Sequence, residues 1–282
     1  MTLATRRGVV TGLAATALAG CATAAERPAL RIKGRPVQGG TLIGRTAPRA
    51  TIRLDGEVVG RASSRGLFVV GFDRDAAPRA TLRVEGGGGG AVQILDIAPG
   101  DFDIQRIDGL AEDQVMPQAP ELLARIADEA QRKAAGFASN IDADHFRRGF
   151  VMPVKATRIS ARFGGQRILN GAPSRPHYGV DLAAPVGTTV RAPAAGVVAF
   201  AETGLHYEGG LIMIDHGQGL VTAYLHLSKV VVRQGQPIRR GHKIGEVGAE
   251  GRATGPHLCW RMKWRGRNLD PTLLIGVKAP RF

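Results

Sequence analysis

Cysteines and aromatic residues are scarce in this chain. Two of its 282 residues are cysteines and 5% are aromatic. So few cysteines exclude the dense disulfide framework on which many small secreted domains depend. Because aromatic side chains are rare, the cores must be built from Ala, Val, Leu and Ile, and a hydrophobic content of 44% is sufficient for that. The length is typical of two domains, and 39 glycines with 16 prolines favour a β-rich chain rather than a helical bundle.

Acidic residues are outnumbered by basic ones, 24 to 38, which leaves a net charge of +14. This balance favours an anionic partner, unless it is simply a solvated basic surface. Nucleic acid is the usual partner of so basic a chain, but we do not expect it here because the N-terminus has the features of an export signal. Anionic polymers of the cell envelope or lipid head groups are then the expected partners.

Residues 1–20 have the pattern of a signal peptide. Arg6 and Arg7 precede an apolar stretch that is too short to remain as a membrane-spanning helix. The stretch ends in Leu-Ala-Gly-Cys, which resembles the lipobox of bacterial lipoproteins and marks Cys21 for lipidation. The two arginines also fit, loosely, a twin-arginine (Tat) export signal. The alternative is an ordinary secretory signal that is cleaved within residues 23–25.

A lipidated Cys21 would make the protein a membrane-anchored lipoprotein of the cell envelope that faces the periplasm. Ala22 replaces the aspartate that is associated with retention at the inner membrane, so the outer membrane is favoured. Acylation of Cys21 would leave Cys259 as a lone thiol. In an oxidising compartment such a thiol has to be buried or ligated, and the residues around it therefore matter. Nothing in the sequence indicates the oligomeric state.

Short apolar runs between turn signals predict a small, immunoglobulin-like β-sandwich over residues 27–98. Asp55-Gly56 is a hairpin signal within it, and the glycines at 86–90 predict a flexible loop. No polar cluster suggestive of catalysis occurs in this stretch.

Residues 99–150 predict a linker that contains one helix, 119–137, with Pro120 near its start and an apolar stripe along one face. Strand and turn patterns then predict an antiparallel β domain over residues 151–275. The expected fold class is mostly β: a sandwich, a connecting helix and a second β domain.

Two short motifs carry ligand-type side chains. His177, Gly179 and Asp181 alternate, so on a strand they would share one face, and the glycine would leave room for an ion. The same alternation of faces along a strand would place His257 and Cys259 on one face, and His226 lies on another expected strand. Imidazole, carboxylate and thiolate are all good zinc ligands.

Together these motifs resemble the lysostaphin/LytM-type zinc endopeptidases of peptidase family M23. The resemblance runs from about Pro153 to Thr272 and keeps the order of the motifs, which makes it far more specific than any one of them. Its elements are Arg162-Phe163-Gly164, the His177 motif, Ala183-Ala184-Pro185, Asp215-His216-Gly217, the His226 motif, Arg240-Gly241 and Thr254-Gly255-Pro256-His257.

The resemblance implies an antiparallel β peptidase domain with one zinc ion. His177 and Asp181 would be metal ligands, and His226 and His257 would act as general base and electrophilic stabiliser. The family's third ligand is the second histidine of an H-x-H pair, and here that position is Cys259. A thiolate with a carboxylate neutralises Zn²⁺, so we expect zinc to bind and the reaction rate to differ.

Three further residues are candidates for contact with the substrate. Arg162 could meet carboxylates, Tyr224 precedes His226 by two and is expected to share its face, and His206 lies in a loop that could wall the groove. The resemblance and the export signal together imply hydrolysis of peptide bonds in the stems or cross-links of peptidoglycan. The alternative is a weak or inactive scaffold of the same fold that binds the wall or activates a wall amidase.

Overall fold

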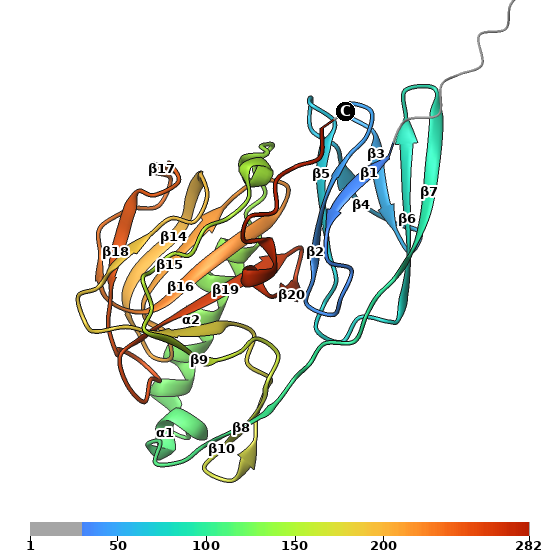
Figure 1. Cartoon of the computed structure of the whole chain (residues 1–282). Helices are drawn as coiled ribbons and strands as arrows, with labels where there is room; N and C mark the ends of the chain where they lie inside the picture. Colours follow the sequence, from blue (N-terminus) through green and yellow to red (C-terminus); the bar gives the residue numbers. More distant parts are fainter. Residues whose placement is uncertain (1–29, 282) are drawn as a thin grey trace, which may run out of the picture.

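A computed structural model describes residues 30–281 of the chain. The predicted signal peptide and the lipidation site Cys21 lie outside these residues. The described part is mostly β, as expected, and its sheets are almost wholly antiparallel (Figure 1).

The N-terminal β domain consists of two antiparallel sheets. One has the order β1-β2-β5 and the other β4-β3-β6-β7. Buried residues alternate along β3 and β6, which places Ile52, Leu54, Leu82 and Val84 in the core. The strands are β1 (Arg31–Gly34), β2 (Thr41–Arg45), β3 (Thr51–Leu54), β4 (Glu57–Arg61), β5 (Leu67–Gly71), β6 (Arg79–Gly86) and β7 (Gly89–Asp96).

The stretch between the two domains holds more structure than one helix. Strand β8 (Ile104–Ile107) pairs in parallel with β10 (Gln166–Leu169) of the second domain. It is followed by α1 (Glu112–Val115), α2 (Pro120–Phe137) and the 3₁₀ helix η1 (His145–Arg148). Helix α2 lies against β14, and a Cβ at Gly136 would meet the Met213 sulfur at 2.8 Å, so this glycine permits close packing of the helix on the sheet.

The C-terminal domain is built on one large sheet with the order β17-β14-β15-β16-β19-β12-β9, joined by β13, β18 and β20. Its central strands β15 and β16 are buried over nearly their whole length. The elements are β9 (Arg158–Ala161), β10, β11 (Ala172–Pro173), β12 (Val180–Ala183), β13 (Thr189–Arg191), β14 (Gly196–Leu205), β15 (Gly209–Asp215), β16 (Leu220–Val230), β17 (Pro237–Ile238), β18 (Lys243–Val247), β19 (His257–Trp264), β20 (Arg267–Leu269) and η2 (Pro271–Leu274).

The two β domains share one continuous hydrophobic core. Backbone and side-chain hydrogen bonds join them at β20 and its flanks: Asp270 N donates to Gly39 O at 2.8 Å, and Asn268 N donates to Asp73 Oδ2 at 3.2 Å. Within the described residues, none of the helices has the length and apolar character needed to cross a membrane.

A buried hydrogen-bonded chain crosses the core of the second domain. His216 Nδ1 is 2.6 Å from the carbonyl oxygen of Ala195, so this nitrogen carries the hydrogen and Nε2 accepts one from Thr222 at 2.8 Å. The hydroxyl of Tyr224 lies 2.7 Å from that of Thr222 and continues the chain. Burial lowers the pKa of His216 to about 4, against the opposing effects of the Ala195 hydrogen bond and the Asp215 charge.

This histidine should make the fold sensitive to acid. The pKa of His216 rises to about 6.5 on unfolding, so below pH 6.5 the unfolded state binds a proton that the folded state does not. The free energy of unfolding should therefore fall by about 3 kcal/mol between pH 6.5 and 4 from this group. Urea unfolding of His216→Gln at several pH values should show a smaller fall than wild type. The exposed His242→Gln is the control, and an equal pH dependence in H216Q and wild type would contradict the assignment.

Candidate metal centre

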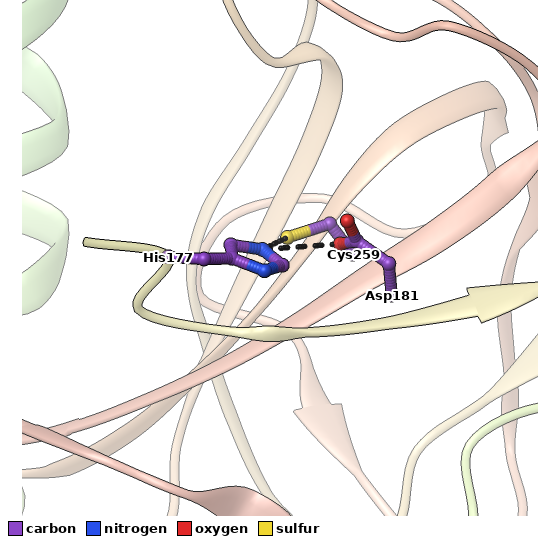
Figure 2. A group of neighbouring side chains, drawn as sticks. All are labelled: His177, Asp181 and Cys259. Carbon is purple, nitrogen blue, oxygen red and sulfur yellow. Dashed lines mark hydrogen bonds and ion pairs between the residues drawn. The ribbon is translucent and has the colours of Figure 1, made fainter. Parts of the chain in front are cut away.

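Asp181 and Cys259 are direct partners in the register of β12 and β19. Side chains opposite each other on antiparallel strands have their Cβ atoms about 4.5–5.5 Å apart, so the two ligand atoms are held together by the sheet itself. His177 reaches the same point: its Nε2 is 3.4 Å from Cys259 Sγ and 3.1 Å from Asp181 Oδ1 (Figure 2). The three side chains are 1–7% exposed.

His177 does not lie on the strand, contrary to the sequence expectation, because β12 begins at Val180. Two backbone hydrogen bonds hold it instead: His177 N donates to Gly165 O, and Gly164 N donates to His177 O, both at 2.7 Å. A Cβ at Gly179 would lie 3.0 Å from Cys259 Sγ and 2.8 Å from Arg261 Cγ. Glycine at 179 therefore leaves the space that the sulfur occupies.

The arrangement fits a divalent metal ion. Bonds of 2.0–2.3 Å that meet at tetrahedral angles separate the ligand atoms by roughly 3.3–3.8 Å. The separations of His177 Nε2 from the sulfur and the carboxylate oxygen, 3.4 and 3.1 Å, are close to these values. Asp181 Oδ1 is also buried without a hydrogen-bond donor among the described residues. A buried carboxylate oxygen in this state is costly unless a cation meets it.

His226 and His257 lie beside this group with their rings 4.7 Å apart. His226 Nδ1 is 2.8 Å from Glu250 O, and His257 Nδ1 is 2.8 Å from Gly255 O. A carbonyl oxygen only accepts, so each Nδ1 carries the hydrogen and each Nε2 keeps its lone pair. His257 Nε2 is 3.7 Å from Asp181 Oδ1, which places it at the edge of the group.

His226 owes its position to a bulge in β16. Tyr224 pairs with Ile212 and Leu227 with Gly210, so two residues of β16 face the single residue Leu211. His226 adopts a φ of 64°, which is uncommon for a residue other than glycine. The bulge breaks the alternation along the strand, and His226 therefore does not share a face with Tyr224.

The structure does not bring the other three candidates into the group. Tyr224 is 0% exposed and bonded to Thr222, so it has no surface that a substrate could reach. Arg162 is exposed and pairs with Asp101 at 2.9 Å. His206 packs edge-to-face against Tyr207 and contacts the backbone of Asp113, in the loop that precedes Glu208.

Residues 175–271 match peptidase family M23. This match contains the three clustered side chains and the two neighbouring histidines: His177, Asp181, Cys259, His226 and His257. The chain carries an M23 peptidase domain.

Several known proteins are similar to the chain. A peptidoglycan DD-endopeptidase of Vibrio cholerae, ShyA, is 43% identical over 40% of this chain and 26% of its own length. The DD-carboxypeptidase/endopeptidase Mpg of Neisseria meningitidis is 42% identical over 46% of this chain and 29% of its own. The chain thus spans under a third of the length of these relatives. A Pseudomonas aeruginosa crystal structure described as a peptidase M23 superposes with a TM-score of 0.67 at 29% identity, over 86% of this chain and 96% of that one.

Two arginines contact the candidate metal ligands. Arg261 Nε donates to Cys259 Sγ at 3.4 Å, and Arg167 Nη2 lies 3.2 Å from Asp181 Oδ2. Neither was among the sequence candidates. Arg261 follows Cys259 by two on β19, so the alternation that pairs His257 with Cys259 also indicates Arg261. Arg167 lies on β10, and nothing in its neighbourhood in the sequence indicates this contact.

Burial and charge act in opposite directions on these groups. Burial lowers the pKa of Arg261, but the charge and hydrogen bond of Cys259, with Glu208 and Asp181, outweigh it and the pKa lies above its usual value. Burial raises the pKa of Asp181, but His177, His257 and Arg167 together lower it by more than burial raises it. The pKa therefore lies below its usual value and this carboxyl stays ionised. Burial is the main cause that lowers the pKa of His226 and of His257. Both rings therefore remain neutral near pH 7.

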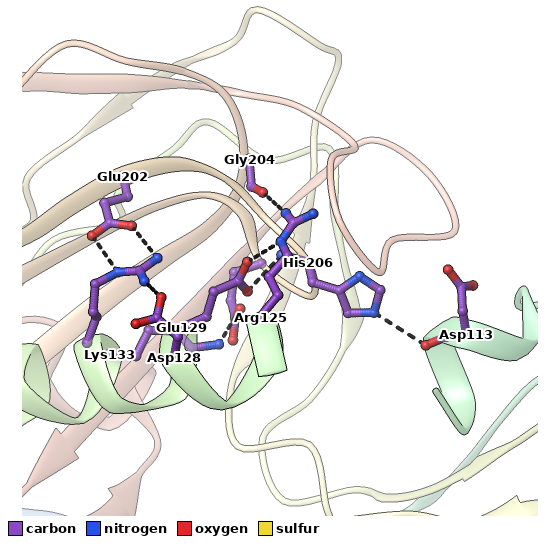
Figure 3. Close-up of polar contacts among 10 residues, drawn as sticks. Asp113, Arg125, Asp128, Glu129, Lys133, Glu202, Gly204 and His206 are labelled. Carbon is purple, nitrogen blue, oxygen red and sulfur yellow. Dashed lines mark hydrogen bonds and ion pairs between the residues drawn. The ribbon is translucent and has the colours of Figure 1, made fainter. Parts of the chain in front are cut away.

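Helix α2 fixes the loop that supports His226. Lys133 pairs with Glu208 at 2.6 Å with both side chains largely buried, and the Glu208 carbonyl accepts from His226 N at 2.8 Å. Arg125 bridges Glu129 and the Gly204 carbonyl, and Glu129 accepts from His206 N at 2.9 Å (Figure 3). The charged face of α2 therefore binds the β14–β15 hairpin.

The cysteine ligand and Arg261 should be energetically coupled. Cys259→His exchanges an anionic ligand for a neutral one, and beside Arg261 the group then carries surplus positive charge that repels a divalent ion. Two unit charges about 5 Å apart at an effective dielectric constant of 20 interact by roughly 3 kcal/mol. We expect C259H to weaken zinc affinity about tenfold in wild type and clearly less in an Arg261→Met background. Competition with a chelator measures these affinities.

The control for this cycle is Arg265→Met, which removes the same charge from an exposed position beyond β19. In that background the effect of C259H should equal its effect in wild type. Equal losses in the R261M and wild-type backgrounds would contradict the coupling.

Proposed function

We propose that the chain is a zinc metallopeptidase that hydrolyses peptide bonds in the stems or cross-links of peptidoglycan. The observation that carries this proposal is the convergence of His177, Asp181 and Cys259 beside two histidines whose Nδ1 atoms are held by backbone carbonyls. His177, Asp181 and Cys259 would hold the ion. A bound zinc ion supplies Lewis acidity, which lowers the pKa of water and polarises a carbonyl group.

The chain's own residues supply the proton transfers. Neutral His226 accepts a proton at Nε2 from the attacking water, because the Glu250 carbonyl holds its hydrogen on Nδ1. His257 stands 4.7 Å away, ring to ring, and its part is to stabilise the oxyanion that develops on the carbonyl oxygen, which requires the form that is protonated at Nε2 and donates from it. The Gly255 carbonyl orients the His257 ring in the same way.

The substrate class draws its support from the relatives. Two of them bear names that describe DD-endopeptidase activity, one on peptidoglycan, and the matched region includes the whole centre. A net charge of +14 also suits an anionic wall polymer. Because the chain spans only part of these relatives, its bond specificity within the wall is part of the proposal.

We also propose export to the cell envelope as a lipoprotein anchored through Cys21, with the outer membrane as the favoured location. This rests on the sequence of residues 1–22 alone. Metabolic labelling with a radioactive fatty acid should label the wild-type protein and leave Cys21→Ala unlabelled. Equal labelling of both would refute the anchor.

Muropeptide analysis tests the activity. Purified wild-type protein that begins after residue 21, loaded with zinc, should convert cross-linked muropeptides to shorter products that mass spectrometry identifies. His226→Ala should lower the rate by roughly 10²–10⁴, the usual contribution of a general base, and keep its zinc. Cys259→Ala should lose zinc and activity together. The exposed His242→Ala should behave as wild type. Zinc-loaded wild type without turnover would favour the scaffold alternative.

The pH dependence of hydrolysis should reflect the lowered pKa of His226. Its neutral form is the competent one, and burial lowers the pKa, so the neutral form persists below the ordinary histidine value. The acid limb of the kcat/KM profile should therefore have its midpoint below pH 6.5. A midpoint above pH 7 would contradict a lowered pKa for His226 and its role as the neutral general base.

A further inference from the structure

A large pocket that is remote from the metal centre is strongly basic. It has a volume of about 710 Å³ and lies where the N-terminal β domain, η1 and the turn after β17 meet. Six arginines and two aspartates contribute to its lining, which gives a net charge of +4. The arginines are Arg49, Arg65, Arg147, Arg148, Arg239 and Arg240.

We propose that this pocket binds a ligand that carries more than one negatively charged phosphate group. The guanidinium group presents paired N–H donors that match phosphate oxygens, and several such groups around one pocket match a polyanion. The volume is in the range of small-molecule sites, about 300–1,000 Å³, and exceeds the need of a single small ion.

A buried carboxylate orients part of the arginine set. Asp144 is 8% exposed. Its Oδ1 lies 2.9 Å from Arg65 Nη1 and 3.4 Å from Arg147 Nη1. Arg65 belongs to the N-terminal β domain and Arg147 to η1 in the connecting stretch, so the pocket forms only when these two parts of the chain are joined. Arg49 pairs with Asp142 at 2.8 Å, but both are exposed and such a pair contributes little.

The other three arginines have no acidic partner among residues 30–281. These are Arg148 on η1 and the adjacent Arg239 and Arg240. Their like charges repel one another, and a polyanion would relieve this repulsion.

The backbone that carries these arginines is held firmly. Phe146 and Phe150, at 0% and 1% exposure, fix η1 on both sides of Arg147 and Arg148. Between them, Gly149 has a φ of 72°, and a Cβ there would lie 2.4 Å from Val277 O. Ile238 is buried and paired with Gly196, which fixes the start of the turn that carries Arg239 and Arg240.

The pocket is separate from the metal centre. Its lining residue Ala195 receives the hydrogen bond from His216, which precedes β16, whereas His226 lies toward the other end of that strand. Residues 220 to 226 of an extended strand span roughly 20 Å. Substitutions in this pocket should therefore leave zinc content and the proposed hydrolysis intact. A failure of the phosphate-binding proposal can thus be told apart from a failure of the proposed function.

Calorimetric titration with inorganic pyrophosphate at low salt tests the proposal. The double variant Arg239→Gln/Arg240→Gln should bind pyrophosphate at least tenfold more weakly than wild type. The matched control is Arg158→Gln/Arg233→Gln, which removes two exposed arginines from outside the pocket and should bind within twofold of wild type. Absence of binding to wild type, or equal weakening in both double variants, would overturn the proposal.

Vesicles distinguish a lipid source of the phosphate from a soluble one. Flotation with phosphatidylcholine vesicles that contain phosphatidic acid should recruit wild type, and not R239Q/R240Q, when the ligand is a head group. Pyrophosphate binding that depends on these arginines, without such recruitment, assigns a soluble phosphorylated ligand.

Discussion

The register between β12 and β19 is the constraint on which the metal centre depends. It sets Asp181 opposite Cys259, and on the other side of β19 the register with β16 sets Leu225 opposite the same cysteine. A slip of one residue would turn Cys259 to the opposite face of the sheet and Leu258 toward the site. Large buried side chains make such a slip costly, since Leu258 and Trp260 are 0% exposed on the opposite face. The packing of the core therefore positions the ligands.

Charge balance is the second condition. The ligand atoms of Asp181 and Cys259 are buried within 4.8 Å of one another, and a carboxylate beside a cysteine that binds a metal as thiolate is tolerable only where positive charge compensates. Arg167 contacts the first and Arg261 the second, and an incoming ion adds further positive charge. The expected exchange of a histidine ligand for Cys259 is thus accompanied by a cation on the same strand, two residues away. The ligand and its arginine form one electrostatic unit.

The mostly β class and the family resemblance were predictable because turn signals and ordered motifs are local in sequence. The His257–Cys259 pair followed from strand alternation, and β19 runs through both residues. The same rule failed for Tyr224 and His226, because a bulge reverses the faces and no residue type marks it. Strand β8 was not predicted, since its four residues are stabilised by the distant β10. The predicted domain boundaries and the roles of the site residues stay predictions.

X-ray absorption at the zinc edge, on purified protein loaded with one equivalent of zinc, tests the central claim most directly. The account predicts one sulfur neighbour at about 2.3 Å and nitrogen or oxygen neighbours at about 2.0–2.1 Å. A shell of nitrogen and oxygen alone, or a failure to retain zinc, would show that Cys259 does not hold the ion and would contradict the account.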